Sequence, residues 1–106
     1  MTGAYSFVCS EGSTQKLCAR LNDLGGWRWT IGDSYWYGDY ARCIPFPGVK
    51  LRIVDFPVRT GDEFTYNADV RLTPDCGTPM VEIDRTFRDV LVQIGARDIR
   101  EIQPFD

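Results

Sequence analysis

Residues 64–72 constrain the fold more than any other segment, because apolar and polar side chains alternate along them without a break. The apolar positions are Phe64, Tyr66, Ala68, Val70 and Leu72, and between them lie Thr65, Asn67, Asp69 and Arg71. Successive side chains of a strand point to opposite faces, so this pattern predicts a strand with one buried face and one wet or partner-covered face. Such strands are typical of an antiparallel sheet that helices cover on one side.

Shorter runs of β-forming or alternating residues predict further strands at residues 5–9, 27–31, 40–44, 49–53 and 96–102. In the second of these strands, Trp27, Trp29 and Ile31 are expected on the buried face. Residues 32–39 and 60–62 contain Gly and Asp and are predicted as turns.

Two segments carry apolar residues at helical spacing and are predicted as helices, residues 13–24 and 78–94. The N-cap candidates of the first helix are Ser10, Gly12, Ser13 and Thr14, and Gly25-Gly26 ends it. In the second helix, Thr78 is the expected N-cap and Pro79 the first helical residue. Its apolar stripe consists of Met80, Ile83, Phe87, Val90, Leu91 and Ile94.

The order of these elements is a strand, a helix, a run of strands, a helix and a last strand, which favours the α+β class. We expect a single α+β domain over residues 1–106, because the chain is too short for a second core. Its antiparallel or mixed sheet would have five to six strands, with two helices on one face. A strand–helix–strand unit near each end indicates a ferredoxin-like, split βαβ order with an extra hairpin.

The chain contains no histidine, and this excludes several classes of site. A histidine-activated Ser or Cys nucleophile needs that side chain, and so does a zinc ion held by histidine. The four cysteines, Cys9, Cys18, Cys43 and Cys76, form no C-x-x-C pair. We therefore predict no catalytic residues, no metal and no cofactor, and expect a protein that is not an enzyme, while an enzymatic role stays open.

The first residues lack the basic and then apolar pattern of a signal peptide. No apolar run approaches the length of about 20 residues that spans a bilayer. We therefore expect a cytoplasmic protein without a membrane partner. In that reducing compartment the four cysteines are expected as free thiols that pack as small apolar groups.

The net charge of −3 is distributed unevenly along the chain. Residues 27–59 carry five basic and three acidic side chains, whereas residues 60–106 carry five basic and ten acidic ones. A protein that binds a phosphate backbone needs a broad basic surface, so nucleic acid is not the expected partner. The acidic half favours another protein with a basic surface, and a homodimer is kept as an alternative.

Residues 32–40 are the most unusual segment, with four aromatic and two acidic side chains. Tyr and Trp are enriched in binding hot spots, and Asp side chains pair with Arg or Lys of a partner. The predicted partner-binding residues of this aromatic–acidic loop are Asp33, Tyr35, Trp36, Tyr37, Asp39 and Tyr40. In the alternative interpretation the loop folds back on the core.

These features favour a small, non-catalytic protein-binding domain that uses the aromatic–acidic loop. Small bacterial inhibitors, such as immunity proteins and antitoxins, share this physical character, because they neutralise basic proteins through acidic and aromatic side chains. The alternative is a small-molecule-binding or enzymatic ferredoxin-like domain with a pocket between sheet and loop, whose polar groups are Asp33, Asp39, Tyr40 or Arg42. A concave site with converging polar groups would favour that alternative.

The wet face of the predicted sheet is a second candidate site. With the expected register, four arginines point away from the helices, Arg28, Arg42, Arg52 and Arg71, and Lys50 lies beside Arg52. This face is interpreted either as a solvated surface with cross-strand charge pairs or as a site for an anionic ligand or a dimer partner.

Overall fold

The alternating segment 64–72 forms strand β5 (Glu63–Leu72) in a computed structural model that describes residues 2–34, 38–61 and 63–103. The other strands are β1 (Thr2–Cys9), β2 (Thr30–Ser34), β3 (Gly38–Cys43), β4 (Val49–Thr60) and β6 (Arg97–Ile102). The helices are α1 (Thr14–Asp23) and α2 (Met80–Gln93). Element types and approximate positions therefore follow the sequence patterns.

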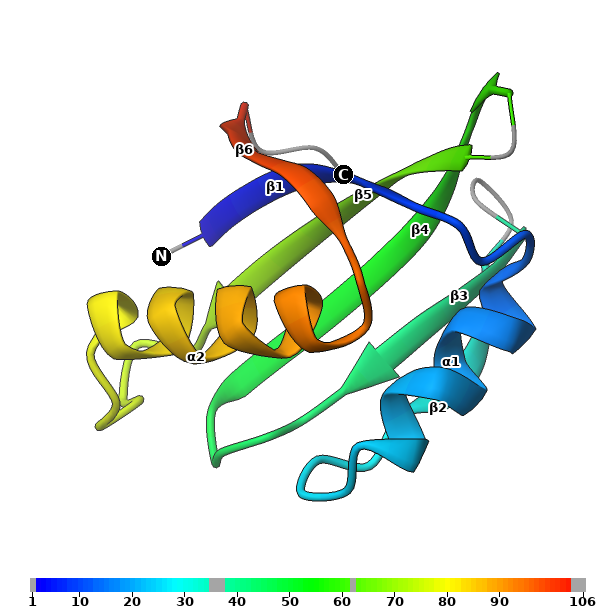
Figure 1. Ribbon diagram of the computed structural model, residues 1–106. Coiled ribbons are helices and arrows are strands. Elements are labelled where there is room, and N and C mark those ends of the chain that lie inside the picture. Colours follow the sequence, from blue (N-terminus) through cyan, green and yellow to red (C-terminus); the bar gives the residue numbers. More distant parts are fainter. Residues whose placement is uncertain (1, 35–37, 62, 104–106) are drawn as a thin grey trace.

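The described strands form a six-stranded sheet in the order β2-β3-β4-β5-β1-β6. Each neighbouring pair within the described residues runs antiparallel. Both helices lie on the same face of this sheet, with α1 against β2 and β3 (Figure 1). The α+β class, the antiparallel sheet and the two helices are thus confirmed, and no helix of the described residues lies on the other face of the sheet.

The core lies between the two helices and the covered face of the sheet. Tyr66, Ala68 and Val70 of β5 are fully buried there, as the alternating pattern predicts. Phe87 of α2 is also fully buried, and its ring packs edge-to-face on Tyr5 with centroids 5.6 Å apart. The apolar stripe of α2 therefore faces the sheet, as predicted. We call the opposite face of the sheet the helix-free face.

The helix ends match most of the expected signals. Ser13 caps α1, because its side-chain oxygen accepts a hydrogen bond from the backbone N–H of Lys16. Gly95 ends α2 in the left-handed region, with φ of 84°. Thr78, in contrast, does not cap α2. The cap position is Pro79, whose carbonyl accepts the first helical hydrogen bond from Ile83, so the helix begins one residue later than predicted.

The strand predicted at residues 27–31 begins later than expected, because the first residue of β2 is Thr30. The side chain of Asn22, on α1, binds the backbone of Trp29 at both its N–H, at 2.7 Å, and its carbonyl, at 3.0 Å. These groups are therefore not available to a neighbouring strand. Trp29 is buried as expected, but Ile31 is 37% exposed because β2 is the edge strand.

The predicted turn over residues 32–39 is too long, because β2 and β3 extend into it from both sides. Gly32 and Tyr40 are cross-strand partners, and the Tyr40 ring lies where a side chain at residue 32 would stand. A glycine at that position lets the ring cover the backbone of β2. The extended pairing also makes Asp33 and Asp39 cross-strand partners.

The four cysteines are free thiols in the structure, and Cys9, Cys18 and Cys43 are buried in the core. Within the described ranges, no helix combines the length and the apolar character needed to cross a bilayer.

Candidate functional site

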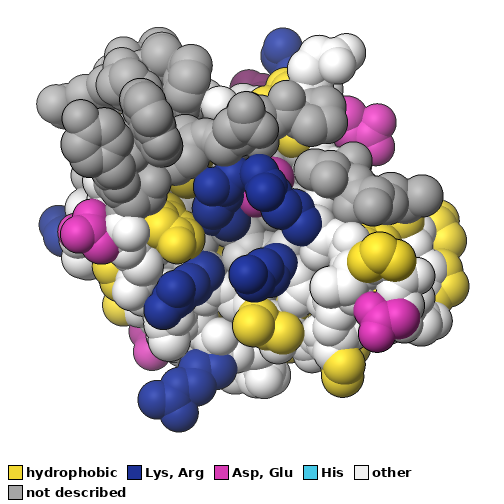
Figure 2. All heavy atoms as spheres, turned by 180° about the vertical axis from the view of Figure 1, so that it is seen from behind, with side chains coloured by type: hydrophobic (Ala, Val, Ile, Leu, Met, Phe, Trp, Pro, Cys, Tyr) yellow, Lys and Arg dark blue, Asp and Glu magenta, His cyan; other side chains and the backbone are white. Residues whose placement is uncertain are grey.

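The helix-free face of the sheet gathers basic side chains because of the strand register. Arg42 of β3 is the cross-strand partner of Arg52 of β4, and Arg52 is in turn the partner of Asp69 of β5. Two residues along β4, Lys50 is the partner of Arg71 of β5. Since residues two apart in a strand share a face, these side chains project together, and Figure 2 shows them clustered on the back of the molecule.

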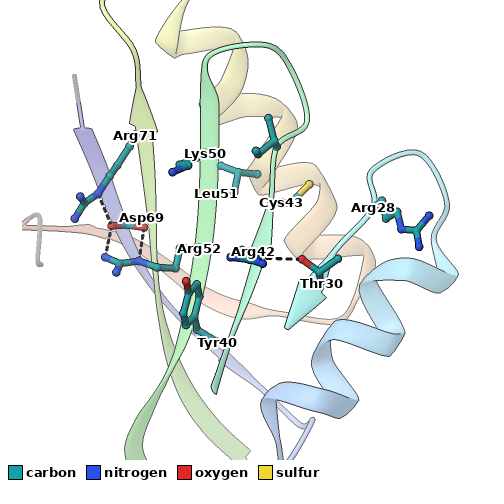
Figure 3. A pocket seen from close by; sticks show the side chains of 11 residues that line it. Arg28, Thr30, Tyr40, Arg42, Cys43, Lys50, Leu51, Arg52, Asp69 and Arg71 are labelled. Atoms are coloured by element: carbon teal, nitrogen blue, oxygen red, sulfur yellow. Dashed lines mark hydrogen bonds and ion pairs between the residues drawn. The ribbon is translucent and has the colours of Figure 1, made fainter. Parts of the chain in front are cut away.

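The clustered side chains surround a hollow with a volume of about 700 Å³. Its charged lining residues are Arg28, Arg42, Lys50, Arg52, Arg71 and Asp69. Figure 3 shows Arg28 at one side and Arg71 at the other, with Arg42 and Lys50 between them. The lining therefore has a formal charge of +4, although the whole chain has a net charge of −3. We call this site the basic hollow.

Asp69 orders one side of the basic hollow. Its carboxylate accepts hydrogen bonds from Arg52 Nε at 3.1 Å and Arg52 Nη2 at 2.6 Å. Arg71 Nε donates to the same carboxylate at 3.3 Å. The Asp69 side chain is only 1% exposed, so this ion pair is shielded from water and holds the Arg52 guanidinium in one orientation.

The other side of the basic hollow carries cations without such compensation. Arg42 Nε donates to the Thr30 hydroxyl at 3.3 Å, which is a neutral acceptor. Within the described residues, Arg28, Arg42 and Lys50 have no carboxylate partner. These three side chains line the basic hollow without a neutralising carboxylate, and their positive potential attracts a negatively charged ligand.

The position of Arg28 depends on the connection between α1 and β2. The neighbouring Trp29 is held by Asn22, and Trp27 packs edge-to-face on Phe46 with centroids 6.0 Å apart. Both aromatic neighbours of Arg28 are therefore anchored to the rest of the fold, and the arginine between them lines the basic hollow.

The structure brings the four arginines of the predicted wet face together, with Lys50 among them. It also places Tyr40 in the lining, although Tyr40 was expected in the aromatic–acidic loop. Asp33 and Asp39 are exposed at the β2–β3 hairpin, and Asp39 accepts a hydrogen bond from Gln15 of α1 at 2.6 Å. The loop residues Tyr35, Trp36 and Tyr37 lie outside the described residues.

Of the four polar groups named for a pocket, Tyr40 and Arg42 line the basic hollow, whereas Asp33 and Asp39 are not among its lining residues. Side chains alternate along β3, so Asp39 lies on the side of α1 whereas Tyr40 and Arg42 lie on the helix-free face. The carboxylate that lines the basic hollow is Asp69 instead.

Sequence reasoning missed two contributors to this site, Asn22 and Ile44. It placed Asp69 on the wet face among the arginines, but it did not predict the burial of Asp69 or its two hydrogen bonds with Arg52. Ile44 lines the basic hollow and is 66% exposed. The available signals were an aspartate in a row of arginines and an apolar residue directly before Pro45, and neither is specific.

The chemistry of the basic hollow is that of anion recognition. Arg guanidinium groups bind carboxylates and phosphates through paired hydrogen bonds, and Lys adds a point charge. Across the described part of the chain, no three Cys, Asp or Glu side chains approach closely enough to hold a metal ion. No protein-family model matches the sequence, and no curated protein is significantly similar to it.

Proposed function

We propose that this protein binds an anionic ligand in the basic hollow. The observation that carries the proposal is a cavity of about 700 Å³ lined by Arg28, Arg42 and Lys50, which have no carboxylate partner among the described residues. Cavities of this size are typical of small-molecule sites. An anion there would supply the negative charge that the lining lacks.

The cross-strand pairs support this proposal energetically. Arg42 lies opposite Arg52, and Lys50 lies opposite Arg71. Like charges directly opposite each other destabilise a sheet, and the Asp69 carboxylate offsets part of that repulsion. A bound anion near Arg42 and Lys50 would reduce it further, so ligand binding is expected to raise the melting temperature of the protein.

The test is a charge-removal experiment on the full chain. Arg42→Gln/Lys50→Gln removes two cations of the hollow, and Lys16→Gln/Arg85→Gln removes two exposed cations on the helices as a matched control. Calorimetric titration with pyrophosphate, inorganic phosphate and tetraglutamate measures anion binding to each protein. We expect the first variant to weaken binding about tenfold or more, and the control to leave it nearly unchanged.

Two results would contradict the proposal. One is the absence of binding for all three anions, and the other is an equal loss of affinity in both variants. The second result would show that the anions sense only the overall charge. Circular dichroism of both variants checks that each is folded, which is expected because Arg42, Lys50, Lys16 and Arg85 are all exposed.

A second candidate function is recognition of a basic protein by the β2–β3 hairpin, as an inhibitor of the immunity-protein or antitoxin kind would do. The observation that favours it is the exposed cross-strand pair Asp33 and Asp39, whose like charges would be stabilised by an Arg or Lys of a partner. Asp33→Asn/Asp39→Asn should then slow association with a basic protein captured from the native source. An unchanged association rate would argue against this role.

We also propose that the sheet is an elaborated ferredoxin-like fold. The strands β4, β5, β1 and β6 lie side by side, with β1 between β5 and β6, as a split βαβ arrangement requires. In this interpretation the β2–β3 hairpin is an addition at the β4 edge. An experimental structure with β6 next to any strand other than β1 would contradict it.

A further inference from the structure

We infer that the ligand of the basic hollow is a small organic diphosphate, a molecule with two linked phosphate groups and a short apolar part. The inference rests on the proposed anion-binding function and adds the chemical class of the anion. Three features of the hollow point to it: the arrangement of its cations, their number, and the exposed isoleucine in its lining.

The arrangement of the cations favours phosphate over carboxylate. A planar carboxylate already occupies the fork of Arg52, because Asp69 binds it through two hydrogen bonds. The remaining cations reach the hollow from different elements: Arg28 from the α1–β2 connection, Arg42 from β3 and Lys50 from β4 (Figure 3). A tetrahedral phosphate offers three acceptor oxygens that point in different directions, so it is able to meet cations on several sides at once.

The number of cations favours two phosphate groups over one. Arg28, Arg42 and Lys50 line the hollow without a carboxylate partner among the described residues, and together they carry a formal charge of +3. A phosphate monoester carries about −1.5 to −2 charges near neutral pH, so one group leaves about one of these cations unbalanced. Two linked phosphate groups on one organic part carry about −3, because the bridging oxygen has no proton to lose, and they balance all three. The cavity volume of about 700 Å³ leaves room for a diphosphate together with an organic part.

The apolar part of the ligand is expected to contact Ile44. This side chain is 66% exposed and yet lines a hollow whose other exposed members are polar, namely Thr30 and the cations. A purely inorganic anion would leave it in water. A short alkyl or aryl group on the diphosphate would cover it and remove apolar area from solvent.

The first test compares probes on the unmodified protein by calorimetry. Pyrophosphate is expected to bind about tenfold or more tightly than inorganic phosphate and tetraglutamate, because the second phosphate adds charged hydrogen bonds. Dimethylallyl diphosphate, the alkyl probe, is expected to bind at least as tightly as pyrophosphate. The Arg42→Gln/Lys50→Gln variant should lose most of this binding, and Lys16→Gln/Arg85→Gln should retain it.

The pH dependence of binding separates phosphate from carboxylate recognition. The chain has no histidine, the side chain whose ordinary pKa falls between about pH 5.5 and about pH 7.5. The second pKa of a phosphate lies near 6, whereas glutamate carboxylates titrate near 4.3. Affinity for pyrophosphate should therefore fall as the pH is lowered across this window, and affinity for tetraglutamate should not.

The Ile44 contact has its own control. Ile44→Ala should weaken binding of dimethylallyl diphosphate several-fold and leave pyrophosphate binding unchanged. Val92→Ala, at a similarly exposed position on α2, should change neither.

Several outcomes would overturn this inference while leaving the proposed function intact. Tetraglutamate binding as tightly as pyrophosphate would indicate a carboxylate ligand, and equal affinities for phosphate and pyrophosphate would indicate a single-phosphate site. A single-stranded oligonucleotide that binds more tightly than both diphosphates would indicate a nucleic-acid surface. Binding of no anion would overturn the inference together with the proposed function.

Discussion

Asp69 of β5 binds Arg52 of β4 through two hydrogen bonds, and this ion pair lies almost fully shielded from water on the helix-free face of the sheet. The cations of the basic hollow are therefore of two kinds. Arg52 and Arg71 contact a carboxylate of the protein, whereas Arg42 and Lys50 have none within the described residues. The uncompensated cations are therefore the expected contacts of a bound anion.

Asp69→Asn tests the structural role of this ion pair. The substitution keeps the shape of the side chain but removes its charge, so the Arg52 and Arg71 guanidinium groups lose their ion pairs with this carboxylate. We expect the free energy of unfolding to fall by about 2 kcal/mol, less than for a fully buried pair because Arg71 is half exposed. Urea denaturation measures the change. Asp89→Asn, on the exposed side of α2, is the control and should change stability by less than about 0.5 kcal/mol.

Phe87→Ala tests the packing of α2 on the sheet. The Phe87 ring is fully buried and contacts Tyr5 and Trp29. Its removal leaves a cavity, and we expect a loss of about 3–5 kcal/mol in denaturant unfolding. Val92→Ala, on the exposed side of the same helix, should cost far less. A loss below about 1 kcal/mol for Phe87→Ala would show that the helix packs in another phase.

Tyr5→Phe tests the contact that joins the first strand to α2. The Tyr5 hydroxyl donates to Asp84 Oδ1 at 2.5 Å, across 79 residues of sequence. Burial, together with this bond to a carboxylate, raises the pKa of Tyr5 above its usual range. We expect Tyr5→Phe to cost about 1–2 kcal/mol. In a double-mutant cycle with Asp84→Asn, a coupling energy near zero would contradict the bond.

Alkaline pH should weaken the fold through the buried thiol of Cys43. Burial, with a smaller effect of Cys18, raises the pKa of Cys43 to about 11. Below about pH 9, the ordinary pKa of a thiol, the group is largely protonated in both the folded and the unfolded chain, so it has little effect on stability. Between there and pH 11 the unfolded chain releases the proton and the folded chain keeps it, so the free energy of unfolding falls with rising pH.

The size of this alkaline effect is on the order of 2–3 kcal/mol, because one pKa unit corresponds to about 1.4 kcal/mol. Urea unfolding at a series of pH values from about 8 to about 11 measures it. Cys43→Ala should flatten the decline, although the Cys18 thiol, whose pKa burial also raises, leaves part of it. An unchanged decline in Cys43→Ala would mean that other groups cause it.

The sequence predicts those features of the fold that depend on local periodicity. The alternation in β5 and the apolar stripe of α2 each specify a face, and both faces are buried as expected. The position of Arg42, Arg52 and Arg71 on one face also follows from alternation. Side chains two residues apart in a strand point to the same face, and so do the side chains of cross-strand partners.

The features that the sequence does not reveal depend on partners far away in the chain. Asp69 is buried only because Arg52, 17 residues earlier, and Arg71 cover it. The start of β2 is set by the side chain of Asn22, which takes the hydrogen bonds that a strand neighbour would otherwise make. The alternation of apolar and polar residues contains neither relationship. It therefore predicted that Asp69 faces solvent and that the strand begins at Trp27.

The most direct test of the central claim is an NMR titration of the full, isotope-labelled protein with pyrophosphate. We predict that the largest chemical-shift changes fall on the helix-free face, at Arg42, Lys50, Arg52 and Asp69, and on the arginine side-chain Nε–H groups there. The exposed face of α2 should stay unchanged. Changes confined to α2, or spread evenly over all exposed basic residues, would contradict an anion site in the basic hollow.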